Sequence, residues 1–213
     1  MVARGLGLIA LLALAWPGTV SAATAGWTDV HVRVYDTGHL TTDTVNRALV
    51  TAGRALAPAG VDVHWTRCPF ERVDTGSNTT APAACIHPMR AGELAVRFVR
   101  VEVSPRYRGM LPLGDALVNR DSGAGVLGTI YVDRVEWLAR AAAADLASLL
   151  GSAIAHELGH LLMGTSTHGA HGGLMRAQWT REEVRRARPN DWQLAAQDRV
   201  RIKERVEKVI DVG

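Results

Sequence analysis

The chain has 213 residues, of which 47% are hydrophobic and 21% are charged, and its formal net charge is +3. This composition is typical of a globular protein, and beyond the N-terminus no charge-free apolar run reaches about 18 residues, which excludes a polytopic membrane protein. The small net charge and the 5% of aromatic residues argue against a nucleic-acid partner. At this length we expect one domain that buries a core of its own.

Residues 1–22 have the pattern of a secretory signal peptide. Arg4 precedes an apolar run at residues 5–15, and residues 20–22 (VSA) fit the small-x-small rule for cleavage. An uncleaved membrane anchor is the alternative, but the run is short for a span, and a proline and a glycine follow it. We therefore expect a secreted or periplasmic protein whose single mature domain, residues 23–213, has no stable membrane span.

The chain contains two cysteines, Cys68 and Cys85. An even pair in an exported protein indicates one disulfide, with free thiols as the alternative. The bond would close residues 69–84, which are rich in Pro, Gly, Asn and Thr and could not pack a core alone. Because a Cys-x-x spacing is missing, the pair does not form a zinc site by itself.

The first half of the mature chain is rich in strand patterns. Alternating stretches with many β-branched residues predict strands. Thr41 offers a helix N-cap, and apolar residues at helical spacing follow it up to Gly60, so a helix separates the first two strands. The predicted strands are residues 30–35, 61–65, 94–103, 115–119 and 129–132.

The second half of the chain is predicted to be helical. Residues 141–163 are rich in Ala and Leu with few breakers, which predicts one long buried helix. Residues 164–173 contain four glycines and are expected to be irregular. From Arg181 onward we expect helix in two pieces, separated at Pro189. This order of strands and helices indicates a mixed α/β (α+β) domain.

The predicted long helix carries an H-E-x-x-H motif at residues 156–160. Residues four apart lie on one face of a helix, so His156 and His160 can point at one metal ion. A catalytic zinc ion takes three protein ligands and one water molecule, and it lowers the pKa of that water to about 7. Glu157 can reach the water rather than the ion, and it would act as the general base.

A third protein ligand is needed to complete such a site. Gly164 follows the helix at a position where a left-handed residue can reverse the chain toward the metal. His168 is the preferred third ligand because it lies nearest that turn. His171, or a more remote carboxylate of Glu182 or Glu183, is the alternative.

Residues 155–175 resemble the metzincin clan of zinc endopeptidases, whose motif HExxHxxGxxH is followed by a methionine turn. The HExxH part matches directly, and Met175 after two small or apolar residues resembles the methionine turn. The resemblance implies a zinc endopeptidase with a twisted, mostly parallel sheet, an antiparallel edge strand, a long active-site helix and C-terminal helices. Residues 156–179 are also similar to exported bacterial proteins described as zinc proteases.

The sequence departs from the metzincin motif after the second histidine. The family glycine would stand at Met163, whereas Gly164 is one residue later. The third histidine would stand at Ser166, whereas His168 is two residues later. The turn is therefore longer by two residues. These departures concern the third ligand and the substrate cleft, and they leave the HExxH chemistry intact.

Together these patterns predict an exported zinc endopeptidase that hydrolyses peptide or protein substrates. Zinc would be held by His156, His160 and His168, with Glu157 as the general base. The alternatives are a catalytically degenerate, zinc-binding scaffold protein on a protease fold, to which the altered spacing points, and a cell-envelope amidase, to which the compartment points.

Overall fold

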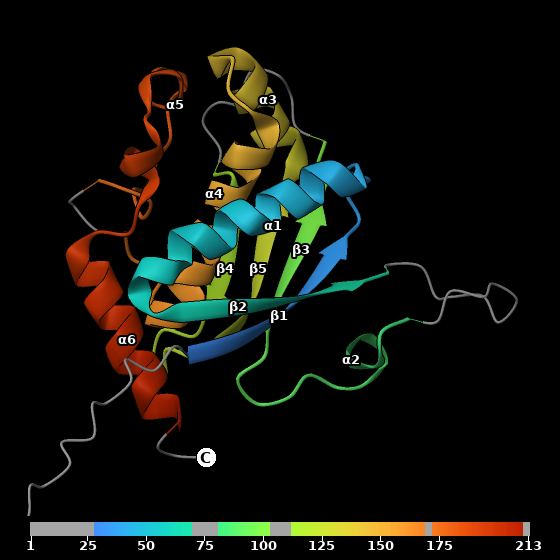
Figure 1. Ribbon diagram of the computed structural model, residues 1–213, viewed down its shortest axis with the longest axis vertical. Coiled ribbons are helices and arrows are strands. Elements are labelled where there is room, and N and C mark those ends of the chain that lie inside the picture. The colour runs from blue at the N-terminus through green and yellow to red at the C-terminus, as the bar shows by residue number, and fades with distance from the viewer. Residues whose placement is uncertain (1–27, 70–80, 103–111, 169–171, 211–213) are drawn as a thin grey trace, which may run out of the picture.

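The computed structural model describes residues 28–69, 81–102, 112–168 and 172–210. A five-stranded sheet in the order β2-β1-β3-β5-β4 forms its centre, and helices cover one face of it (Figure 1). The strands are β1 (Thr28–Asp36), β2 (Val61–Cys68), β3 (Leu94–Val99), β4 (Gly114–Val118) and β5 (Gly125–Tyr131). The predicted signal peptide lies outside the described residues.

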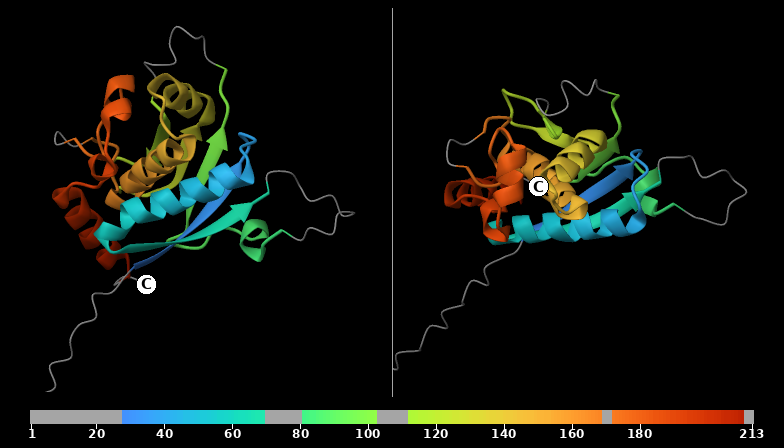
Figure 2. Two further views of the ribbon diagram at one scale, coloured as in Figure 1. Left: turned by 45° about the horizontal axis from the view of Figure 1, so that its top comes forward. Right: turned by 90° about the horizontal axis from the view of Figure 1, so that it is seen from above.

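Helices α1 and α2 lie between strands along the chain, and α3 to α6 come after β5. The C-terminal helices and the short α2 lie at opposite sides of the sheet (Figure 2). The α-helices are α1 (Thr42–Leu56), α2 (Ala83–Ile86), α3 (Val132–Ala142), α4 (Leu146–Met163), α5 (Arg181–Arg186) and α6 (Ala196–Ile210). In the described part of the chain, the 3-10 helix η1 (Ala57–Ala59) lies between α1 and β2, and η3 (Pro189–Trp192) lies between α5 and α6.

The sheet is parallel except at one edge. β1 pairs in parallel with β2 and β3, and β3 pairs in parallel with β5. β4 runs antiparallel to β5 and ends the sheet. The structure therefore confirms a mixed α/β fold with a mostly parallel sheet and an antiparallel edge strand.

Apolar periodicity explains how α1 and β1 meet in the core. In β1 the side chains of Val30, Val32 and Val34 alternate toward the helices and are buried. In α1 the buried residues recur at helical spacing, after Thr41 has capped the helix by accepting a hydrogen bond from the Thr44 N–H. The buried residues of α1 are Val45, Ala48, Leu49, Ala52 and Leu56.

The predicted helix over residues 141–163 is wrong at its start. The structure has two helices there, because Ala143 adopts a left-handed conformation with φ 53° and Asp145 caps α4 by accepting from the Ser148 N–H. Val132, predicted to end a strand, begins α3. The strand predicted to reach residue 103 ends at Val99, and residue 103 itself lies outside the described residues.

Helix α4 is the centre of the core. Its residues Leu150, Ile154 and Leu158 are fully buried, and a Cβ on Gly151 would lie 2.5 Å from the Ala48 carbonyl oxygen of α1. Among the described residues, α4 is the helix whose length and hydropathy would suit a membrane span, yet 83% of it is buried in the domain. Its apolar composition is that of a core helix.

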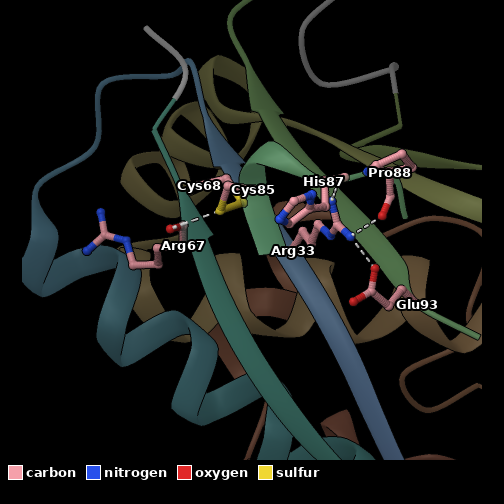
Figure 3. Close-up of a disulfide and its surroundings, with 7 residues drawn as sticks. All are labelled: Arg33, Arg67, Cys68, Cys85, His87, Pro88 and Glu93. Carbon is pink, nitrogen blue, oxygen red and sulfur yellow. Dashed lines mark hydrogen bonds and ion pairs between the residues drawn. A yellow bond between two sulfur atoms is a disulfide. The ribbon is translucent and has the colours of Figure 1, made fainter. Parts of the chain in front are cut away.

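The predicted disulfide is present between Cys68, at the end of β2, and Cys85 of α2 (Figure 3). The segment after α2 is also fixed to the sheet by the buried Arg33 of β1. Its guanidinium donates to the carbonyl oxygens of His87 (2.7 Å) and Pro88 (3.0 Å) and forms an ion pair with Glu93 (Figure 3). The disulfide and the arginine together hold this irregular segment against the outer face of the sheet.

Candidate metal centre

The end of α4 sets the geometry of the site. Gly164 adopts the expected left-handed conformation with φ 64°, and its N–H and that of Thr165 donate back to the last turn of the helix. The chain therefore reverses at Gly164. His168 returns to the face of α4 that carries His156 and His160.

The three histidines meet at their Nε2 atoms. The Nε2 of His160 lies 3.1 Å from that of His156 and 3.3 Å from that of His168, and the remaining pair is 3.2 Å apart. Ligand nitrogens bound about 2.0–2.1 Å from a tetrahedral ion lie about 3.3–3.4 Å from one another. The three nitrogens thus have the spacing of ligands around one zinc ion.

Backbone carbonyls orient two of the rings. His156 donates from Nδ1 to the Leu174 carbonyl oxygen (2.7 Å), and His160 donates from Nδ1 to the Thr165 carbonyl oxygen (2.8 Å). A carbonyl oxygen can only accept, so Nδ1 carries the hydrogen and Nε2 presents its lone pair. Both rings are therefore fixed in the tautomer that binds a metal through Nε2.

Burial keeps the three rings in the neutral form that binds a metal. It lowers the pKa of His156 to about 3 and that of His160 to about 4. Burial also lowers the pKa of His168, which is less enclosed. Since a metal competes with protons for the same lone pairs, this environment favours the metal near neutral pH.

Met175 lies under the site, as the methionine turn implies. Its side chain is 1% exposed, and a Cβ on Gly159 would lie 2.7 Å from its sulfur. Gly159, between the two histidines of the motif, therefore leaves the space that Met175 fills. Gly173, with φ 69°, turns the chain just before, and the Leu174 N–H donates to the Gln193 carbonyl oxygen.

Glu157 is 5% exposed and lies against the sheet edge rather than among the histidines. A Cβ on Gly114 of β4 would lie 2.7 Å from its Oε1, and one on Gly128 of β5 would lie 3.2 Å from its Cβ. Burial, with the negative charge of Asp115 nearby, raises the pKa of Glu157 to about 8. Neither glycine was expected to lie at the site, although a glycine inside a strand is the usual sign of a close approach.

A cleft of about 300 Å³ opens over the site. Residues 112–116 at the sheet edge and residues 176–180 are two continuous stretches of its lining. Trp137, Leu138 and Ala153 contribute apolar side chains to its lining, and Glu157 and the three histidines line it as well. The predicted ligands and the predicted base therefore face one open space.

The alternative third ligands are placed differently. His171 lies outside the described residues. Glu182 lies on α5 and pairs with Arg185 and Arg186, and Glu183 pairs with Arg176 at 2.9 Å. Of the candidates that the structure describes, His168 is the one it brings to the other two histidines.

Comparisons with known proteins add a likeness to solved structures. No protein-family model and no curated protein matches the chain. Among solved structures, the chain is similar to a crystal structure of archaemetzincin from Methanopyrus kandleri, with 14% sequence identity over 88% of this chain and 99% of that chain and a TM-score of 0.49. At this level the likeness carries nothing about activity. The fold and site define the class as a mixed α/β domain with a three-histidine candidate metal centre.

Proposed function

We propose that the protein is an exported, zinc-dependent endopeptidase. The observation that carries the proposal is the convergence of three Nε2 atoms within 3.3 Å of one another, beside a buried glutamate, in an open cleft. His156, His160 and His168 would hold the ion. A zinc ion with three protein ligands keeps one position for water, which suits a catalytic rather than a purely structural site.

The chemistry divides between the ion and one side chain. When bound, zinc lowers the pKa of a water molecule to about 7 and polarises a carbonyl oxygen. Glu157 takes the proton of the attacking water and passes it to the leaving amine. In the metal-free site burial raises the pKa of Glu157 to about 8, so a proton that it has taken can stay on it at neutral pH until the leaving amine receives it. A bound cation nearby would favour the ionised form that takes the proton.

The cleft suits an extended peptide. β4 is the edge strand of the sheet, and within the described residues its outer edge has no strand partner. An extended chain can pair its backbone with such an edge, while side chains enter pockets beside it. The apolar side chains of Trp137, Leu138 and Ala153 in the cleft lining favour a substrate with an apolar side chain.

Export is proposed on two grounds. The first 22 residues have a signal-peptide pattern, and the Cys68–Cys85 disulfide suits an oxidising compartment. N-terminal sequencing of the protein from the producing cell tests this. A start near Ala23 is expected, whereas a cytosolic protein with an intact N-terminus would contradict export.

Replacing Glu157 by glutamine tests the activity. The amide keeps the shape of the side chain but cannot take a proton, so cleavage of a quenched fluorescent peptide library should fall by about 100- to 10,000-fold while zinc stays bound. Full activity in Glu157→Gln would contradict the proposal. Zinc binding without any cleavage by the wild type would favour the scaffold alternative, and release of fragments from peptidoglycan would favour the amidase.

A further inference from the structure

Residues 176–180 form one wall of the cleft, named here the cleft wall, and all five line the cleft. The wall begins directly after the buried Met175 and ends at Thr180, the N-cap of α5. Its Trp179 stands edge-on to His156, with ring centroids 5.7 Å apart, and packs against Trp192 at 4.5 Å. The position of the wall therefore sets what lies beside one candidate metal ligand.

One carboxylate holds both ends of this wall. Oε1 of Glu183 accepts from the Arg176 guanidinium at 2.9 Å. Oε2 accepts from the Thr180 N–H (2.9 Å) and from its hydroxyl (2.8 Å). In return the Glu183 N–H donates to the Thr180 hydroxyl oxygen, which completes a capping box. Charge-assisted bonds of this kind are among the stronger hydrogen bonds in proteins.

The Arg176 end of the wall is also tied to the methionine turn. Arg176 donates from Nε to the Gly173 carbonyl oxygen at 3.1 Å, and its guanidinium lies 5.6 Å from the centre of the Trp192 ring. Hydrogen bonds from the N–H and the hydroxyl of Thr180, and then the nearby Arg176, lower the pKa of Glu183, so its carboxylate is ionised at neutral pH. The hydrogen bonds from Arg176 and Thr180 to the Glu183 carboxylate can therefore all form at neutral pH.

We propose that Glu183 is a positioning residue: by bridging Arg176 and Thr180 it fixes the cleft wall, and with it Trp179, at the place where a substrate chain would lie. The bridge itself is independent of the reaction, while its effect on substrate binding rests on the proposed function.

Glu182 offers a matched control. It is the neighbouring residue on α5 and pairs with Arg185 and, at 3.0 Å, with Arg186, both on the same helix. Glu182→Ala removes a carboxylate and two ion pairs from α5, yet leaves both ends of the cleft wall in place. A general effect of lost charge on α5 would appear in both variants.

Hydrogen exchange of the full mature chain, with and without added zinc, tests the bridge directly. In the wild type, a local opening of the cleft wall must break the hydrogen bonds of Glu183 to Arg176 and Thr180. In Glu183→Ala these bonds are missing and opening costs less free energy, so the backbone amides of residues 177–180 should exchange at least about tenfold faster. Glu182→Ala should leave these amides unchanged. Equal exchange of the wall in the wild type and Glu183→Ala would overturn the proposal.

Kinetics tests the consequence for substrate. With the best-cleaved peptide of a quenched fluorescent library, Glu183→Ala should raise KM about tenfold with a smaller change in kcat and unchanged zinc content, because the wall binds substrate and does not transfer protons. An unchanged KM in Glu183→Ala would overturn the positioning role. A wild type that cleaves no peptide would refute the proposed function, and hydrogen exchange alone would then decide the bridge.

Discussion

At the scale of single residues, the candidate base depends on two glycines in the sheet. Glu157 lies where side chains at Gly114 and Gly128 would otherwise stand. Neither position can be linked to Glu157 from the sequence, because the contact depends on how α4 crosses β4 and β5. The HExxH motif, in contrast, lies within one helical turn, and its histidines could be placed from spacing alone.

Gly114→Ala tests whether Glu157 needs the space that this glycine leaves. The new Cβ would lie 2.7 Å from Glu157 Oε1 and 2.6 Å from the Thr129 carbonyl oxygen, so the carboxyl group must move. We expect kcat to fall about 10- to 100-fold, since small misplacements of a catalytic group are costly, while zinc stays bound. Gly53→Ala in α1, whose Cβ would have its nearest neighbour at 3.9 Å, serves as the control. A wild-type kcat in Gly114→Ala would show that Glu157 does not depend on this space.

The third ligand could be inferred because its reason is local. A glycine after the helix predicted a left-handed reversal, and His168 is the first histidine after it. The tautomers of His156 and His160 could not be inferred. They depend on the carbonyl oxygens of Leu174 and Thr165, whose positions follow from the methionine turn and the reversal.

At the scale of elements, alternation predicted the sheet well, while the helix boundaries were partly wrong. α3 was missed because it follows β5 with no turn residue between them, although Val132, Val135, Leu138 and Ala139 recur at helical spacing. Its separation from α4 is signalled by Asp145, a good N-cap residue inside an Ala-rich run. The short α2 has too few residues to show any period.

The disulfide is an element-scale feature with a measurable contribution. It closes a loop with a sequence separation of 17, so reduction should lower the free energy of unfolding by about 3 kcal/mol. Urea unfolding with and without reductant, compared with the Cys68→Ala/Cys85→Ala variant, measures this. Zinc content should not change, because the bond joins β2 to α2, and neither element contributes a ligand of the three-histidine site or a residue of the cleft lining. An unfolding midpoint that ignores reductant would contradict the prediction.

At the scale of the whole molecule, one helix supplies both the core and the ligands. The same α4 buries Leu150, Ile154 and Leu158 and carries His156 and His160. Ligand binding and folding are therefore coupled, and the buried neutral imidazoles link both to pH.

The metal-free protein should lose stability in acid. The pKa values of His156 and His160 are lowered to about 3 and about 4, so the unfolded chain binds protons that the folded chain does not. The stability that these two histidines contribute is fully present above their unfolded pKa of about 6.5 and falls below it, by up to about 1.4 kcal/mol per pH unit for each histidine. Glu157 opposes this by up to the amount of one group, because its pKa is raised to about 8 and the folded chain therefore keeps a proton that the unfolded chain loses. Urea unfolding between pH 7 and pH 4.5 measures the slope. In His156→Gln/His160→Gln the loss of stability in acid should disappear or reverse, because the contribution of Glu157 is left, and an equal slope in that variant would contradict the prediction.

The most direct test of the central claim is the zinc content of the purified mature protein, measured beside His168→Ala. The geometry predicts one zinc ion per wild-type chain and binding at least about 100-fold weaker in the variant, because one of three convergent ligands is lost. Full zinc content in His168→Ala would contradict the three-histidine site and move the third ligand to His171 or a carboxylate. A wild type that takes up no zinc even after reconstitution would contradict the metal centre altogether.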